Sequence, residues 1–95
     1  MATPVVIFTR LTATPGRGND LLMILEDLAV ATRHEPGNDV FAVHGARDEP
    51  DVVLGYEVFR DDDALAAHRA SEAVRVAQER LSDVLAEPPV ISYAI

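Results

Sequence analysis

The stretch VFAVHGARDEPDVVLGYEVF, residues 40–59, decides the fold. Two runs rich in β-branched and aromatic residues, 40–47 and 52–59, flank a polar segment that contains a proline. Such runs, separated by a short turn, are typical of two strands joined as an antiparallel hairpin. The middle of the chain is therefore predicted to form part of a sheet.

The residues before this hairpin predict a strand followed by an amphipathic helix. The strand is VVIFTRL, residues 5–11, and it ends at a Thr-Pro-Gly turn. Asn19 or Asp20 is expected to cap a helix whose apolar residues recur at three- and four-residue steps. Because Pro36 disfavours a helical residue before it, we expect this helix to stop near His34, with Gly37 in a left-handed cap.

The residues after the hairpin predict a second helical segment and a last strand. Three aspartates, residues 61–63, stand where a helix N-terminus favours negative charge. Apolar spacing continues to residue 85, with a bend expected near Ser71, and VISYAI, residues 90–95, reads as a strand. The order β-α-β-β-α-β is the ferredoxin-like arrangement of an α+β protein. We expect a single domain, residues 1–95, with a four-stranded antiparallel sheet and two helices on one face.

The predicted strands are apolar at both odd and even positions, whereas a sheet with one wet face would alternate. Val6, Phe8, Phe41, Val43 and Val53 are expected on the face that the helices leave open. Exposing five such side chains would forgo on the order of 10 kcal/mol, which is comparable to the stability of a whole small domain. We therefore expect this face to be covered by a second copy or by another partner, and a homodimer that packs sheet on sheet is the simplest solution.

Composition excludes several classes of function. The chain has a net charge of −8 at pH 7, which makes nucleic acid and anionic membranes improbable partners. It contains no lysine for Schiff-base chemistry and no cysteine for disulfides, thiolate nucleophiles or iron–sulfur clusters. Without a membrane-length apolar run or a secretory signal pattern, a cytoplasmic protein is expected.

Three polar residues in apolar surroundings are candidates for chemistry. His68 borders the inward stripe of its predicted helix, where it would act as a general base or be a boundary histidine bonded to a carbonyl. Glu57 interrupts an apolar strand and would orient His68, bind substrate or form a structural ion pair. His44 is mid-strand, and the neighbouring Gly45 indicates a bulge or a close approach of backbone or ligand. The three histidines lack metal-ligand spacing, so no metal site is expected.

The sequence resembles the antibiotic biosynthesis monooxygenase family of dimeric α/β barrels. The resemblance is carried by FTRLTATPG, by the EPGN segment at residues 35–38, and by the block from Glu57 to His68, E-x-F-x-D-x-x-A-L-x-x-H. It implies a ferredoxin-like subunit, a sheet-to-sheet dimer, and a pocket between sheet and helices. It also implies oxidation of phenols or quinols by O2 without metal, flavin or haem. By this resemblance His68 and Glu57 would be catalytic, with Phe59 stacking on the substrate ring. Independently of the resemblance, His44 and Tyr56 are candidates for further substrate contacts because of their positions in the predicted strands.

The sequence departs from the family at several positions. Ala73 and Val74 stand where many relatives have a second histidine and an aromatic residue, and Phe59 stands where tryptophan is common. Thr9, His68 and Gln78 occupy the places of the asparagine, tryptophan and haem-ligating histidine of the haem-degrading branch, which disfavours haem oxygenation.

The favoured expectation is a cofactor-independent monooxygenase that acts on a small aromatic phenol or quinol. Two alternatives stay open: an isomerase or cyclase of a small carbonyl compound, and a non-catalytic ligand-binding or stress-associated dimer.

Overall fold

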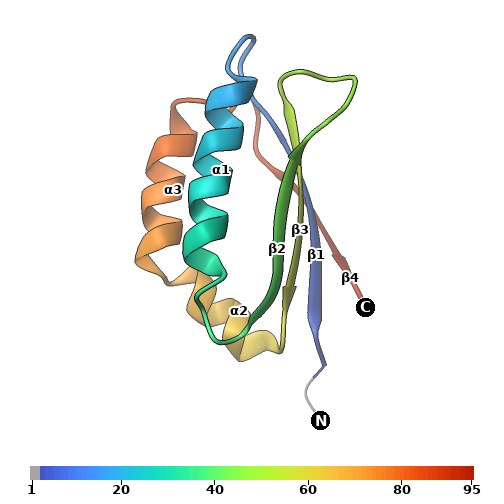
Figure 1. Cartoon of the computed structure of the whole chain (residues 1–95), viewed down its shortest axis with the longest axis vertical. Helices are drawn as coiled ribbons and strands as arrows, with labels where there is room; N and C mark the ends of the chain where they lie inside the picture. The colour runs from blue at the N-terminus through green and yellow to red at the C-terminus, as the bar shows by residue number, and fades with distance from the viewer. Residues whose placement is uncertain (1–2) are drawn as a thin grey trace.

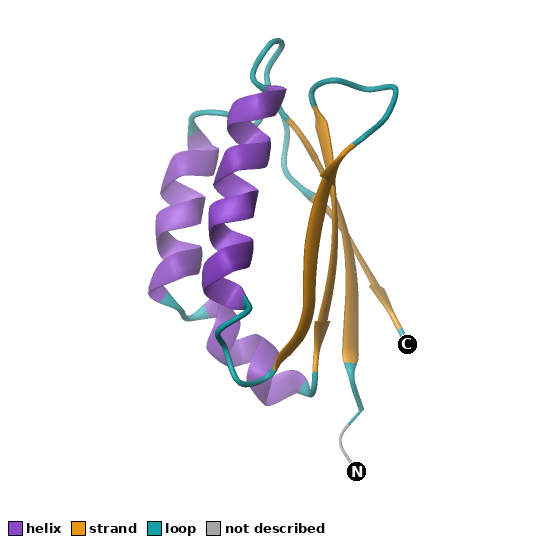
Figure 2. Cartoon of the chain, in the orientation of Figure 1, coloured by secondary structure: helices purple, strands orange, loops and turns teal. Residues whose placement is uncertain are grey.

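The computed structural model describes residues 3–95 as a twisted sheet with helices along one side. In chain order, the elements are β1 (Val5–Thr12), α1 (Gly18–Thr32), β2 (Asn38–Gly45), β3 (Val52–Phe59), α2 (Asp62–Arg69), α3 (Glu72–Ser82) and β4 (Val90–Ala94). The sheet order is β2-β3-β1-β4, and every neighbouring pair is antiparallel. All three helices cover the same face, while the other face is open (Figure 1, Figure 2). The predicted ferredoxin-like α+β fold is confirmed.

The start of α1 differs from the expected cap. Arg17 occupies the N-cap position, and its side chain makes no capping hydrogen bond. Instead, the carboxylate of Asp51, in the β2–β3 turn, accepts hydrogen bonds from the backbone N–H groups of Gly16 and Gly18. A carboxylate from another part of the chain thus fills the role that Asn19 or Asp20 was expected to fill.

The second helical segment divides at the expected place. Ser71 separates α2 from α3, and its hydroxyl accepts a hydrogen bond from the backbone of Val74, so it caps the new helix. At the start of α2, the Asp61 carboxylate accepts from the backbone of Ala64 at 2.8 Å. These caps fix the direction of α2 relative to the sheet.

Two glycines behave differently from their predicted roles. Among residues 3–95, Gly16 is the one residue with positive φ, so Gly37 is not a left-handed cap. Gly37 is needed for space, because a Cβ there would overlap Ala64 on α2. At Gly45, an added Cβ would meet no atom within 4 Å, and the register shift of this sheet edge lies between Asn38 and Val40. The expected bulge at Gly45 is therefore absent, and no described part of the chain approaches Gly45 closely; the approach of a ligand stays a prediction.

The strands present two different apolar sets to the two faces of the sheet. Phe41 and Val53 are buried against the helices, and Val43 packs against the same core, so their expected place on the open face is wrong. The open face instead carries a set of half-exposed apolar side chains on even-numbered positions: Phe8, Val40, Leu54, Tyr56 and Val90. The core lies between the odd-numbered positions of the inner strands and helices α1 and α3.

Candidate functional site

His68 lies in the last turn of α2 with its ring against the sheet. His68 is 6% exposed. Its imidazole packs on the ring of Phe59, with 4.8 Å between the ring centroids and an angle of 40° between the ring planes. The ring of Phe41 is 6.0 Å away on another side. Since these aromatic rings restrict the imidazole, its two nitrogens point in fixed directions.

The turn between α1 and β2 brings a carboxylate to this imidazole. The Arg33 guanidinium donates two hydrogen bonds to the carbonyl of Phe41, which ties the turn to β2. The backbone N–H of Arg60 donates to the carbonyl of Gly37, which ties the turn to the end of β3. Between these two attachments, Glu35 extends over α2 toward His68.

The contact with Glu35 determines which imidazole nitrogen is free. Nδ1 of His68 lies 3.1 Å from Oε1 and 3.3 Å from Oε2 of Glu35. An ionised carboxylate accepts hydrogen bonds only, so Nδ1 carries the hydrogen. In the neutral ring, Nε2 therefore has the lone pair and is the basic atom.

Glu57, on β3, faces Nε2 from the sheet. Its Oε1 is 3.9 Å from Nε2 of His68, and its side chain is 13% exposed. Burial raises the pKa of Glu57 to about 7; the nearby Arg69 opposes this rise and Glu35 adds to it. Near neutral pH, Glu57 is thus divided between a carboxylic acid, which can donate a hydrogen bond, and a carboxylate.

A cavity of about 200 Å³ lies beside these two residues, between the sheet and helices α1 and α3. Its polar lining consists of four side chains: Thr9, Glu57, His68 and Gln78. Its apolar lining is supplied by the helices, the strands and the segment before β4: Leu11, Leu25, Leu28, Phe41, Val43, Val74, Ala77, Leu81, Pro89 and Ile91. An adjoining hollow of about 140 Å³ shares Thr9, Glu57, His68 and Ile91 and is bordered by Arg69. The site is therefore an apolar chamber with a histidine–carboxylate pair in one wall.

The structure brings together only some of the residues singled out in the sequence. His68 and Glu57 meet at the cavity. Phe59 is fully buried behind the imidazole and is not among the cavity-lining residues, so it supports His68 and has no surface for a substrate ring. His44 and Tyr56 have even-numbered positions and lie on the open face, across the sheet from the cavity.

Glu35 is the site residue that sequence reasoning did not assign. It is part of the EPGN segment, but it is 33 positions away from His68, and no helical or strand periodicity relates them. The resemblance marked the segment without indicating which side chain matters. Only the path of the turn, held by Arg33 and Gly37, shows that Glu35 contacts the imidazole.

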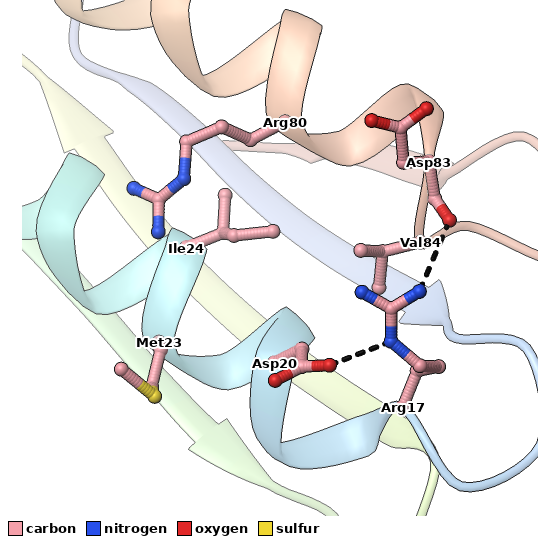
Figure 3. A pocket seen from close by; sticks show the side chains of 7 residues that line it. All are labelled: Arg17, Asp20, Met23, Ile24, Arg80, Asp83 and Val84. Carbon is pink, nitrogen blue, oxygen red and sulfur yellow. Dashed lines mark hydrogen bonds and ion pairs between the residues drawn. The ribbon is translucent and has the colours of Figure 1, made fainter.

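A second hollow, of about 290 Å³, lies at the N-terminal end of α1 and the C-terminal end of α3 (Figure 3). Its cations are already paired: Arg17 donates to Asp20 at 2.6 Å, and Arg80 donates to Asp27 at 2.8 Å. Because its charges neutralise one another at the surface, this hollow offers less to a ligand than the cavity at His68.

The described residues contain neither a helix suited to span a membrane nor a cluster of side chains suited to bind a metal ion. Within residues 3–95, no helix has the length and apolar character needed to cross a bilayer. Over the same residues, no group of three or more histidine, aspartate or glutamate side chains is placed to hold a metal ion.

The ferredoxin-like sheet, with a histidine–carboxylate pair at an apolar cavity between sheet and helices, places this chain in a class of small α+β proteins. Within that class, residues 4–80 match the family model of the antibiotic biosynthesis monooxygenases. Since the match spans most of the chain, this protein belongs to that family.

Solved structures from several bacteria are similar over almost their whole length. PA3566 from Pseudomonas aeruginosa is 26% identical, with a TM-score of 0.92 over 99% of this chain and 94% of that chain. Rv0793 from Mycobacterium tuberculosis is 22% identical, with a TM-score of 0.89 over 98% and 94%. SO0527 from Shewanella oneidensis is 23% identical, with a TM-score of 0.89 over 99% and 91%. A sequence comparison with curated proteins finds no significant match.

Proposed function

We propose that this protein is a cofactor-independent monooxygenase that oxidises a small phenol or quinol with O2 in the cytoplasm. The observation that carries the proposal is the buried imidazole of His68, which lines an apolar cavity, with Nδ1 held by Glu35 and Nε2 on the side of Glu57. A base in such a place can remove a proton from a hydroxyl group that is held against apolar side chains. Membership in the antibiotic biosynthesis monooxygenase family supports the reaction class.

The residues of the site have separate roles in this reaction. Nε2 of His68 accepts the proton of the substrate hydroxyl, and the Glu35 carboxylate stabilises the imidazolium that forms. Glu57, when protonated, donates a hydrogen bond to the oxygen anion of the substrate. This electron-rich anion is the reductant of O2: one oxygen atom becomes a carbonyl oxygen of a quinone product, and the other leaves as water with the two hydrogens that the substrate loses. All four electrons taken up by O2 therefore come from the substrate. The apolar walls keep competing water away from the anion.

The proposal includes a homodimer formed through the open face of the sheet. Support comes from the half-exposed apolar side chains on this face, among which the rings of Phe8 and Tyr56 lie 5.1 Å apart. Contiguous apolar patches of this kind on a soluble protein mark association surfaces. Pairing two copies would cover both sheets and leave the cavity on the opposite side of each.

Oxygen uptake, measured together with product mass, tests the reaction. A panel of phenols and quinols is screened with an oxygen electrode, and products of active compounds are examined for one added oxygen atom. His68→Ala is expected to lower uptake by at least about a hundredfold, the usual scale of a general base. His34→Ala is the matched control, because His34 is an exposed histidine next to the same turn.

Two results would count against the proposal. Unchanged uptake by the His68 variant would remove the imidazole from the chemistry. A product of unchanged mass, formed without oxygen consumption, would indicate an isomerase or cyclase that uses the same base.

A further inference from the structure

The charged groups around the cavity at His68 are mostly acidic. Among the described residues that line it, none is an arginine, and the chain has no lysine. The acidic side chain of Glu57 is in the wall, and the carboxylate of Glu35 lies just behind His68. An anionic group placed among the leucines of this chamber would have no arginine or lysine in the described lining to pair with, and when the imidazole of His68 is neutral it would have no cation there at all.

Among the described residues that line the cavity and its adjoining hollow, the one arginine is at the edge, while the guanidinium of Arg33 is bonded to the backbone carbonyl of Phe41. Arg69 is exposed, borders the smaller adjoining hollow, and donates a hydrogen bond to the hydroxyl of Tyr93 on β4. Its charge acts on Glu57, whose pKa it lowers against the effect of burial, so Arg69 is already engaged by the carboxyl group in the wall and is not among the residues that line the larger cavity. Removing a carboxylate from water without a partner is strongly unfavourable.

The volume restricts the size of the occupant. An apolar cavity of about 150 Å³ is enough to hold one benzene ring. At about 200 Å³, this chamber accommodates one ring with a small substituent, and a larger substituent would extend into the adjoining hollow. Gln78 is exposed and lies in the lining, which places an uncharged hydrogen-bonding group at the mouth.

From this lining we infer that the cavity takes an uncharged, single-ring compound with one hydroxyl group directed at His68 and an apolar remainder against Leu25, Leu28 and Leu81. It rejects compounds of the same shape that carry a carboxylate on the ring. The inference rests on the proposed function in taking this cavity as the substrate site. It adds the charge and size of the substrate, which the family alone leaves open.

Two probes of nearly equal shape test the inference: 4-hydroxyacetophenone, which is neutral, and 4-hydroxybenzoate, which is an anion. Binding to the full chain is measured without oxygen by calorimetry and by methyl NMR shifts of the cavity leucines, at about pH 7, which is above the ordinary pKa of an imidazole and below that of a phenol. The neutral probe is expected to bind at least about tenfold more tightly. Gln78→Arg, which adds a cation at the exposed mouth, is expected to improve binding of 4-hydroxybenzoate by at least about threefold relative to binding of the neutral probe.

The outcomes separate this inference from the proposed reaction. Equal binding of the two probes to the unmodified protein, or no binding of the neutral one, overturns the ligand class. A Gln78→Arg variant that does not gain affinity for the anion also contradicts it, because charge would then not be the cause. If the neutral probe binds as expected but no phenol supports oxygen uptake, the monooxygenase proposal fails and the ligand class stands.

Discussion

At position 57, a carboxyl group is enclosed in a wall of apolar side chains beside an imidazole. Its folded-state pKa of about 7 is above its ordinary value of 4.5, because burial penalises the charged form. The unfolded chain therefore ionises more readily than the folded one, and folding stability must fall as the pH rises between these values. Below about pH 4.5 the group is protonated in both states, and no penalty remains.

Glu57→Gln should remove this dependence, since the amide resembles the protonated acid in shape and never ionises. The variant is expected to match the original protein near pH 4.5 and to become more stable above pH 7, by at most about 3 kcal/mol. Urea denaturation below, within and above this range measures the difference. Glu26→Gln, at an exposed position on α1, is the control. If the two proteins differed in free energy of unfolding by the same amount at every pH, the ionisation of buried Glu57 would not be the cause of the difference.

The candidate residues show which parts of the site a sequence can indicate. Tyr56 is adjacent to Glu57 in a strand, so the two-residue alternation alone places them on opposite faces. For His44, the face depends on its partner across the hairpin, Leu54, and that register is set by the turn. The burial of Phe59 depends on how α2 packs on the sheet, and the contact of Glu35 with His68 depends on the position of the turn between α1 and β2. These are tertiary facts with no periodic signal.

At the scale of elements, the turn between α1 and β2 is held against α2 by a glycine contact. Gly37→Ala would push a methyl group into Ala64 and is expected to cost about 1–3 kcal/mol of stability, the usual range for overpacking. Thermal or urea unfolding measures this loss. Gly45→Ala is a matched control, because its new methyl group meets open space and the backbone there has no positive φ.

The Gly37–Ala64 contact is expected to affect the position of Glu35 as well as the stability of the fold. Since the same turn carries Glu35, Gly37→Ala should also change the NMR signals of the His68 ring, whereas Gly45→Ala should not. If Gly37→Ala and Gly45→Ala were equally stable, the turn would be able to move away from Ala64 at little cost and would not hold Glu35 in place.

Helices and strands could be predicted from the sequence where turn residues and capping side chains lie next to the element that they stabilise. The hairpin, the helix start at Asp61–Asp63 and the break at Ser71 follow from turn residues and caps that act within four positions. The start of α1 did not follow the local pattern, because its capping carboxylate comes from Asp51, 33 positions away. Local propensity thus predicts an element when its stabilising groups are local as well.

For the whole molecule, the sequence indicates that both sheet faces are apolar but not which residues form each face. The assignment requires the register of all four strands, because cross-strand partners share a face. In the structure, Phe8, Tyr56 and Ser92 are aligned across β1, β3 and β4. The two inner strands therefore place Phe8 and Tyr56 at the centre of the open face, where a second copy would cover them.

Phe8→Arg tests this arrangement. Two copies packed face to face would bring the new charges together in an interface without a carboxylate partner, so the dimer is expected to dissociate at micromolar concentrations in sedimentation experiments. Met23→Arg is the control, because Met23 is also an exposed apolar residue, at 59%, but lies on α1. Unchanged far-UV circular dichroism would show that the subunit still folds. A Phe8→Arg protein that sediments as a dimer, or an unmodified protein that is monomeric, would mean that the open sheet is covered in another way.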